Sequence, residues 1–322
     1  MTVPSNFSAS ASAKADLPLA VGPAMTTRGR RVLFIATLIA ADVLPASDVS
    51  AAADALEQAG CAPVGWDWLE PGSAADIPFG LDPTGARAVL EGGEFDVVVQ
   101  PLEGRAKRLL IADMDSTMIT VECIDELADY AGIKPEIAAI TERAMRGELD
   151  FEAALDARVA LLAGLDEGVI EECLTERVRI MPGAETLVRT MRARGGRAVL
   201  VSGGFTRFAE PVARAIGFDR AIANRLVIEG GRLTGAVERP IVGAATKLET
   251  LQTEAAALGI GLDQTLAVGD GANDLPMIQA AGLGVAFRAK PVVAAAAAAR
   301  VEHGDLTALL WAQGIGQREW VD

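Results

Sequence analysis

Two aspartates, Asp113 and Asp115, directly follow the apolar stretch 109–112, and the hydroxyl residues Ser116 and Thr117 come next. The apolar stretch is typical of a buried strand, so both carboxylates stand at its carboxyl end. Residues two apart in an extended chain point to the same side, and the two carboxylates can therefore face one site. Such a pair can hold a hard cation, offer a carboxylate nucleophile and bind a phosphate. An acidic strand end that only caps a turn is the structural alternative.

Glycine-rich polar segments follow two later apolar stretches. The stretch 197–201 ends in Ser-Gly-Gly at 202–204, and the stretch 265–268 ends in Gly-Asp-Gly-Ala-Asn-Asp at 269–274. Lys247 begins a helical pattern between them. Ligands of open parallel α/β sheets bind at the carboxyl edge of the strands, so we expect these segments to meet in one crevice.

The residue types in these segments suggest a chemical role for each residue. Asp113 and Asp270 can supply the carboxylate ligands that Mg²⁺ prefers, and Lys247 offers a positive charge to phosphate oxygens. If Asp113 is the nucleophile, an aspartyl-phosphate forms. Asp115 would protonate the leaving alkoxide and then deprotonate the water that hydrolyses the intermediate. Ser202 and the backbone N–H groups after it can cradle the phosphate.

In this order, the four segments resemble the four motifs of the haloacid dehalogenase-like phosphatases. The resemblance covers roughly residues 105–322 and implies a Rossmann-like α/β core with a parallel sheet and an inserted helical cap. It implies a Mg²⁺ site formed by Asp113, the backbone carbonyl of Asp115, and Asp270. It also implies phosphate contacts from Ser202, Gly203, Lys247 and Asn273, with Gly204 and Asp274 beside them.

Three further segments resemble the phosphoserine phosphatase branch of that superfamily. They are residues 122–126, 143–147 and 151–159, all of them outside the shared core. The resemblance implies that Glu122 holds the ammonium group of O-phosphoserine and Arg158 its carboxylate, while Met145 and Phe151 pack over the substrate. A planar guanidinium suits the carboxylate because it can bond both oxygens.

Two alternatives remain open at this point. A related phosphatase or phosphotransferase could act on another small phosphorylated alcohol or amino acid, such as phosphohomoserine. A non-enzymatic alternative is a ligand-sensing regulatory protein built on a phosphatase scaffold. The presence of Asp113, Asp115, Lys247 and Asp270 argues against a degenerate scaffold.

The region between the first two motifs predicts a helical cap over about 122–179. Helices are expected at 123–131, 135–145, 151–162 and 166–178, the last with Asp166 as its N-cap. Because they are inserted beside the proposed nucleophile, we expect them to act as a lid. The whole phosphatase domain is expected to cover residues 103–322.

The N-terminal region divides into two parts. Residues 1–28 are rich in Ser, Ala, Thr and Pro and are predicted to be disordered. Residues 29–102 predict a small α/β domain that weakly resembles the ACT-type ligand-sensing domains and could support a homodimer. The expected elements are a strand at 31–40, a helix at 47–60, a strand at 62–69, a helix at 83–90 and a strand at 95–100, one strand fewer than the four of that fold.

Composition limits the remaining possibilities. The net charge of -15 argues against nucleic-acid binding, which needs a basic footprint. No apolar run is long enough to predict a membrane span. Cys61, Cys123 and Cys173 are odd in number and widely separated, which favours a reducing cytoplasm. The arginines at 28–31 before an apolar run permit an export signal, which we disfavour because the run is short and ends at Asp42.

Overall fold

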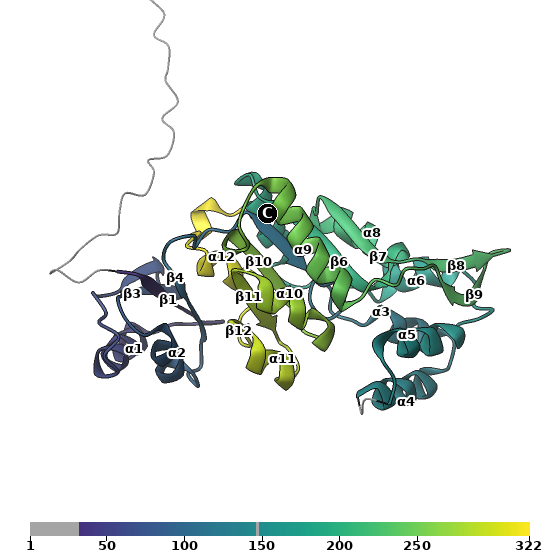
Figure 1. Cartoon of the computed structure of the whole chain (residues 1–322), viewed down its shortest axis with the longest axis horizontal. Coiled ribbons are helices and arrows are strands. Elements are labelled where there is room, and N and C mark those ends of the chain that lie inside the picture. The colour runs from purple at the N-terminus through teal and green to yellow at the C-terminus, as the bar shows by residue number, and fades with distance from the viewer. Residues whose placement is uncertain (1–31, 146–147) are drawn as a thin grey trace, which may run out of the picture.

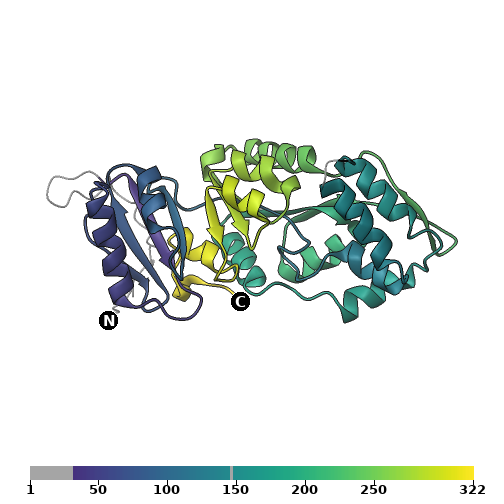
Figure 2. The same ribbon diagram turned by 90° about the horizontal axis from the view of Figure 1, so that it is seen from below.

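The computed structural model describes residues 32–145 and 148–322. The segment 1–28 and the arginines at 28–31 lie outside the described residues. Along the long axis of the molecule, an antiparallel sheet with two helices occupies one end, the parallel sheet lies in the middle, and the helical cap forms the other end (Figures 1 and 2). The predicted α/β class, with a parallel core sheet and an inserted helical cap, is confirmed.

The N-terminal domain has four strands, so the prediction of three was wrong. Its elements are β1 (Phe34–Ile39), α1 (Ala46–Gln58), β2 (Asp67–Glu70), β3 (Ala74–Phe79), α2 (Pro83–Leu90) and β4 (Asp96–Pro101). The antiparallel sheet has the order β2-β3-β1-β4, and the chain order is that of the ferredoxin-like split βαβ motif. The missed strand, β3, contains Pro78, which argues against a strand in sequence reasoning. Since β2 pairs only with residues 74–76, Pro78 interrupts no ladder bond to it.

The central sheet is parallel and has six strands in the order β12-β11-β10-β5-β6-β7. The strands are β5 (Leu109–Ala112), β6 (Arg197–Phe205), β7 (Arg220–Asn224), β10 (Thr265–Gly269), β11 (Leu283–Phe287) and β12 (Ala299–Val301). β5 lies between β10 and β6, so the three strands that carry the predicted motifs are neighbours. β6 is longer than predicted, because the segment 202–204 continues the strand as far as Phe205.

Helices cover both faces of this sheet, which explains why its strands are apolar throughout. Alternate residues of β5 point to opposite faces: Leu110 joins the cluster with Leu187 and Phe208, and Ile111 joins the cluster with Leu251. The first cluster includes residues of α7 (Ala184–Ala193), α8 (Thr206–Ile216) and α12 (Ala308–Ala312), and it continues into the helices of the cap. The helices of the second cluster are α9 (Ala244–Leu258), α10 (Leu275–Ala280) and α11 (Pro291–Ala296).

The cap contains the four predicted helices and a hairpin that the sequence did not predict. The helices are α3 (Cys123–Tyr130), α4 (Lys134–Met145), α5 (Phe151–Ala160) and α6 (Gly168–Glu176), and the hairpin strands are β8 (Leu226–Glu229) and β9 (Arg232–Val237). Helix α6 begins later than expected, and the Asp166 side chain accepts a hydrogen bond from the Gly168 N–H instead of capping the first turn. The hairpin packs against α5, where Gly235 lies close to the Ala160 backbone.

Polar contacts join the N-terminal domain to the core. The Asp96 carboxylate, only 4% exposed, accepts hydrogen bonds from the backbone N–H groups of Glu302, His303 and Gly304. In the linker, the Arg105 guanidinium bonds both oxygens of Asp76 at 2.6 and 2.7 Å. Arg105 also donates to the backbone carbonyls of residues 311 and 312 in α12, so it links both parts.

Candidate active site

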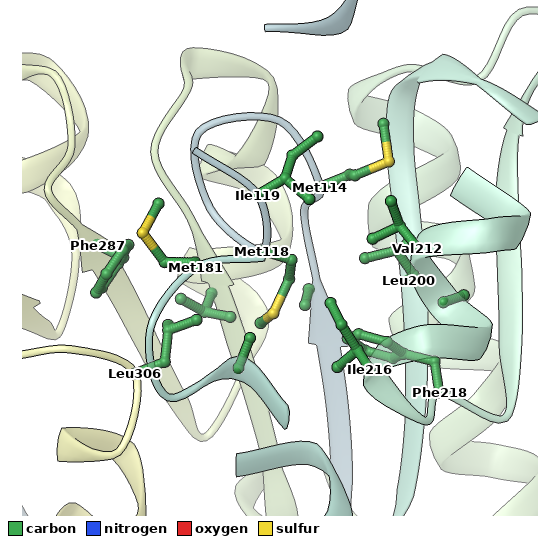
Figure 3. Close-up of a cluster of buried hydrophobic side chains, with 14 of the residues drawn as sticks. Met114, Met118, Ile119, Met181, Leu200, Val212, Ile216, Phe218, Phe287 and Leu306 are labelled. Atoms are coloured by element: carbon green, nitrogen blue, oxygen red, sulfur yellow. The ribbon is translucent and has the colours of Figure 1, made fainter. Parts of the chain in front are cut away.

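The loop after β5 is held by its own methionines. Met114 and Met118 are fully buried and belong to the hydrophobic cluster drawn in Figure 3. The backbone N–H of Met118 donates to the Met114 carbonyl at 2.8 Å, and Ser116 has a left-handed backbone with φ of 55°. With Met114 fixed in the core, Asp113 and Asp115 on either side of it are both directed into the cavity described below.

A buried ammonium group lies behind Asp113. Lys247, in the first turns of α9, is fully buried, and its Nζ donates to Asp113 Oδ1 at 2.5 Å and to Asp274 Oδ1 at 2.6 Å. Burial alone would lower the pKa of Lys247, but the two carboxylates outweigh it and raise that pKa above the ordinary value. Burial and the charge of Asp274 raise the pKa of Asp113, and Lys247 opposes both. Lys247 therefore orients Asp113 and stabilises its ionised form.

Asp115 is fixed by two donors. Its Oδ1 accepts a hydrogen bond from the backbone N–H of Cys123 at 2.8 Å, and its Oδ2 accepts one from Ser202 Oγ at 3.2 Å. The Ser202 Oγ in turn accepts from the Gly204 N–H at 2.8 Å. Burial raises the pKa of Asp115, while these hydrogen bonds lower it. The balance of these effects leaves the pKa of Asp115 above its ordinary value.

The two glycines after Ser202 are required by close approaches. A Cβ at Gly204 would lie 2.7 Å from Asp115 Oδ2, and a Cβ at Gly203 would lie 3.0 Å from the Phe151 ring. Glycine therefore allows β6 to pass directly beside the acid and the cap helix. Asn224, at the end of β7, holds the Gly203 carbonyl through a 2.8 Å hydrogen bond from its side-chain amide.

A cavity of about 180 Å³ opens between this sheet edge and the cap. Its walls contain most of the predicted residues together with five to which the sequence analysis gave no role. The predicted members are Asp113, Asp115, Glu122, Phe151, Arg158, Gly203, Gly204, Asp270 and Asn273. The additional members are Ile124, Leu155, Phe205, Gly271 and Lys290.

Four predicted residues are not in the cavity wall. Lys247 and Ser202 lie behind it and bond the Asp113 and Asp115 side chains that face it, while Asp274 bonds Lys247 and the Gly271 N–H. Met145 ends α4, but its side chain lies outside the described residues.

Opposite charges face the cavity from the cap side. The Glu122 carboxylate accepts a hydrogen bond from Ser116 Oγ at 2.8 Å, and the Arg158 Nε donates to the Ala154 carbonyl within α5. Burial, followed by the charge of Asp115, raises the pKa of Glu122 to about 7. One anion and one cation in the same wall can bind a zwitterion.

Three carboxylates, including that of Asp113, lie close together. Ligand oxygens of Asp113, Asp270 and Asp274 all lie within 4.8 Å of one another. Burial and the charge of Asp274 raise the pKa of Asp270 to about 6, although the Thr117 hydroxyl donates to it at 3.2 Å. Three carboxylates against the single charge of Lys247 leave an excess of negative charge that suits a divalent cation.

A family comparison decides the class of protein. The haloacid dehalogenase-like hydrolase family matches residues 110–279, the segment that runs from β5 through the cap to α10. The chain belongs to this family. The resemblance expected from the four motifs is therefore confirmed, and the chain is a member of a hydrolase family.

Three similar proteins carry related names. A phosphoserine phosphatase from Streptomyces coelicolor is 50% identical over 228 residues, which cover 71% of this chain and 55% of that protein. The crystal structure of a probable phosphoserine phosphatase from Vibrio cholerae covers 88% of both chains, with 35% identity and a TM-score of 0.70. A substrate-bound phosphoserine phosphatase structure matches 64% of this chain and 97% of its own, with 40% identity and a TM-score of 0.60. The chain spans less than two thirds of the length of the first curated relatives it matches.

Proposed function

We propose that this chain is a Mg²⁺-dependent phosphatase that hydrolyses O-phospho-L-serine to L-serine and phosphate. The observation that carries the proposal is the shared cavity of Asp113, Glu122 and Arg158. The two cap side chains match the ammonium and carboxylate of an amino acid, while Asp113 and Asp115 face the same space from the sheet. The phosphoserine phosphatases among the similar proteins support the same substrate class.

In the first half of the proposed reaction, an Asp113 carboxylate oxygen attacks phosphorus and the bond from phosphorus to the serine oxygen breaks. Asp115 gives its proton to that departing oxygen, and serine leaves. In the second half, Asp115 accepts a proton from a water molecule that attacks phosphorus. The bond to Asp113 breaks, phosphate leaves, and both aspartates return to their starting states.

The donor set supports a divalent cation of the Mg²⁺ type. Asp113 and Asp270 would hold it with the Asp115 backbone carbonyl, and Asp274 is less available because Lys247 and the Gly271 N–H occupy its two oxygens. When bound, Mg²⁺ neutralises charge on the phosphoryl group so that an anionic nucleophile can approach. Hard oxygen ligands suit this ion better than softer metals.

The wider context follows from the same proposal. Production of L-serine would make this the last step of serine biosynthesis, in the cytoplasm. Three buried cysteines without disulfides are consistent with a reducing compartment, and among the described residues no helix is long and apolar enough to cross a membrane. We also propose that the N-terminal domain is ACT-like and forms a homodimer contact, since it exposes Val43 and Leu81.

The test is phosphate release from O-phospho-L-serine with Mg²⁺ and with EDTA, beside p-nitrophenyl phosphate and O-phosphothreonine. We expect metal-dependent turnover with a strong preference for phosphoserine. Turnover of the aryl ester alone would overturn the proposed substrate and leave a phosphatase of other specificity. The absence of turnover on all three esters would favour the regulatory-protein alternative.

A further inference from the structure

Lys290 lies in the wall of the catalytic cavity, although it belongs to none of the motifs found in the sequence. It follows β11 and precedes α11, and it lines the cavity beside Asp270, Gly271 and Asn273. Its side chain is exposed, whereas Asp113 at the base of the site is only 6% exposed. Lys290 is therefore on the solvent side of the cavity, next to the loop that follows β10.

The backbone around Lys290 is fixed from two sides. The Lys290 N–H donates to the Asp270 carbonyl at 3.2 Å, which links Lys290 to the loop that follows β10. Two residues earlier, Arg288 donates its backbone N–H to Val301 at 2.9 Å and its guanidinium to the Gly304 carbonyl at 3.1 Å. Gly304 is one of the three residues bound by Asp96 of the N-terminal domain. Lys290 thus stands at a defined position on a braced segment.

The Lys290 ammonium differs from the other two cations of the site in the charges that surround it. The wall contains four carboxylates, those of Asp113, Asp115, Glu122 and Asp270, and two cations, Arg158 and Lys290. The charge of Arg158 interacts with Asp125, Glu122 and Asp115, on the side of the groups proposed to bind the amino acid. Lys247 is enclosed and already donates to two carboxylates. Within the described part of the chain, no ion pair joins the Lys290 ammonium to a carboxylate, although its charge acts on Asp270 and opposes the rise in the pKa of that carboxyl.

A dianionic ester must approach a protein whose net charge is -15 and a wall with more carboxylates than cations. An exposed cation at the entrance offsets this repulsion and can hold phosphate oxygens. A flexible ammonium suits a group that enters and leaves, because it binds as a point charge from several directions.

We propose that Lys290 is a phosphate-binding residue at the entrance of this site, which contacts the phosphate of the incoming ester and of the inorganic product. The inference rests on the proposed phosphatase function and adds a second, solvent-facing phosphate contact to it. The charge of Lys290 acts on Asp270, whereas that of Arg158 acts on the carboxylates of Asp125, Glu122 and Asp115, so we assign Lys290 to the phosphate and not to the amino acid.

The test compares Lys290→Met, which keeps an unbranched apolar stem and removes the charge, with Lys290→Arg. The matched control is Lys134→Met, at the exposed start of α4, which changes the net charge equally. We expect Lys290→Met to lower kcat/KM by about tenfold, the lower range for a lost hydrogen bond between charged groups, on both phosphoserine and p-nitrophenyl phosphate. The Ki of inorganic phosphate should rise by a similar factor. Lys290→Arg should stay within about threefold of the wild type, since the charge is retained.

Salt dependence separates a charge effect from a structural one. Rising ionic strength should lower kcat/KM of the wild type and of Lys134→Met more steeply than that of Lys290→Met. Equal kinetics for Lys290→Met and Lys134→Met would overturn the inference, as would a loss confined to phosphoserine, because the latter assigns Lys290 to the carboxylate. Equal losses in Lys290→Met and Lys290→Arg with unchanged salt slopes would show a purely structural role and also overturn it. If the wild type rejects phosphoserine but hydrolyses the aryl ester, the proposed substrate fails while the Lys290 comparison still stands on the second ester.

Discussion

Lys247 Nζ lies 2.5 Å from Asp113 Oδ1, in a place where the lysine is fully buried and the aspartate almost so. The same ammonium bonds Asp274 at 2.6 Å. One positive charge therefore separates two carboxylates that would otherwise face each other away from water. The resemblance to the family implies that Lys247 contacts phosphate, and its position adds a second role, which is to hold the proposed nucleophile in place.

Replacing Lys247 with Met should remove activity and weaken the fold together. Breaking a buried ion pair by removing one partner costs about 3–5 kcal/mol, because the remaining charges are left uncompensated. Urea unfolding and phosphate release measure the two effects. The double variant Lys247→Met/Asp274→Asn should regain part of the lost stability, since it has one buried carboxylate fewer. A Lys247→Met protein as stable as the wild type would contradict this description of the site.

Replacing Arg158 with Ala should reduce turnover of phosphoserine far more than that of p-nitrophenyl phosphate. Only the amino acid ester has a carboxylate for the guanidinium, and a lost bidentate pair costs about 2–3 kcal/mol, or roughly 30- to 150-fold in kcat/KM. Steady-state kinetics on both esters give the comparison. Arg239→Ala is the control, since the exposed Arg239 in the loop after β9 pairs with Asp156 on the same helix as Arg158. Equal losses on the two esters would show that Arg158 does not bind the carboxylate.

The apparent KM for phosphoserine should rise as the pH falls through about 7. Burial and the charge of Asp115 raise the pKa of Glu122 to about 7, so at lower pH this group takes up a proton and loses the charge that pairs with the substrate ammonium. Simple titration gives about a fivefold rise in KM between pH 7 and pH 6. The phosphate itself also titrates near pH 6, so the ratio to the KM of p-nitrophenyl phosphate isolates Glu122.

Glu122 also makes the free energy of unfolding depend on pH. The folded protein binds the Glu122 proton more tightly than the unfolded chain, so this group's contribution to the free energy of unfolding decreases as the pH rises from 4.5 to about 7. Glu122→Gln should lose both the KM trend and this stability trend. A Glu122→Gln variant that keeps the wild-type KM ratio across this range would contradict the assignment.

Removing residues 1–102 should leave an active but less stable protein. All the cavity residues lie beyond that point, whereas Asp96 and Asp76, which bind the core segment and the linker, would be lost. We expect kcat/KM within about threefold of the wild type and a Tm lower by about 5 °C, equivalent to 1–2 kcal/mol in a domain of this size. Calorimetry and kinetics on residues 103–322 test this expectation. An insoluble or inactive fragment would mean that the N-terminal domain is part of the phosphatase fold.

The sequence predicted which side chains meet at the carboxyl edge of the sheet because the strands that carry them are short apolar runs with polar residues directly after them. Asp113, Asp115 and Asp270 could be placed there from local pattern alone. Contacts that depend on distant segments were not predictable. Asn224 holds Gly203 from the end of a different strand, and Lys290 enters the cavity from a segment with no motif of its own.

The missed strands have a related cause. β3 alternates, with Ala75, Ile77 and Phe79 buried, but it is short and its proline argues against a strand. The hairpin β8–β9 is short and only partly buried, so its pattern is weak. Their pairing is fixed by neighbours in space: β1 for the first, and α5 for the second. Tertiary contacts, and not local preference, determine these elements.

The assignment of Asp113 as the nucleophile is tested most directly by comparing Asp113→Asn with the wild type for turnover and for binding of O-phospho-L-serine. Asparagine keeps the shape and a hydrogen-bond acceptor for Lys247 but cannot serve as the nucleophile. We predict a variant that folds and binds phosphoserine, while kcat falls by about 10⁴-fold or more, in the range seen when a nucleophile is removed. Turnover within about tenfold of the wild type would contradict the assignment of Asp113, and with it the proposed mechanism of this site.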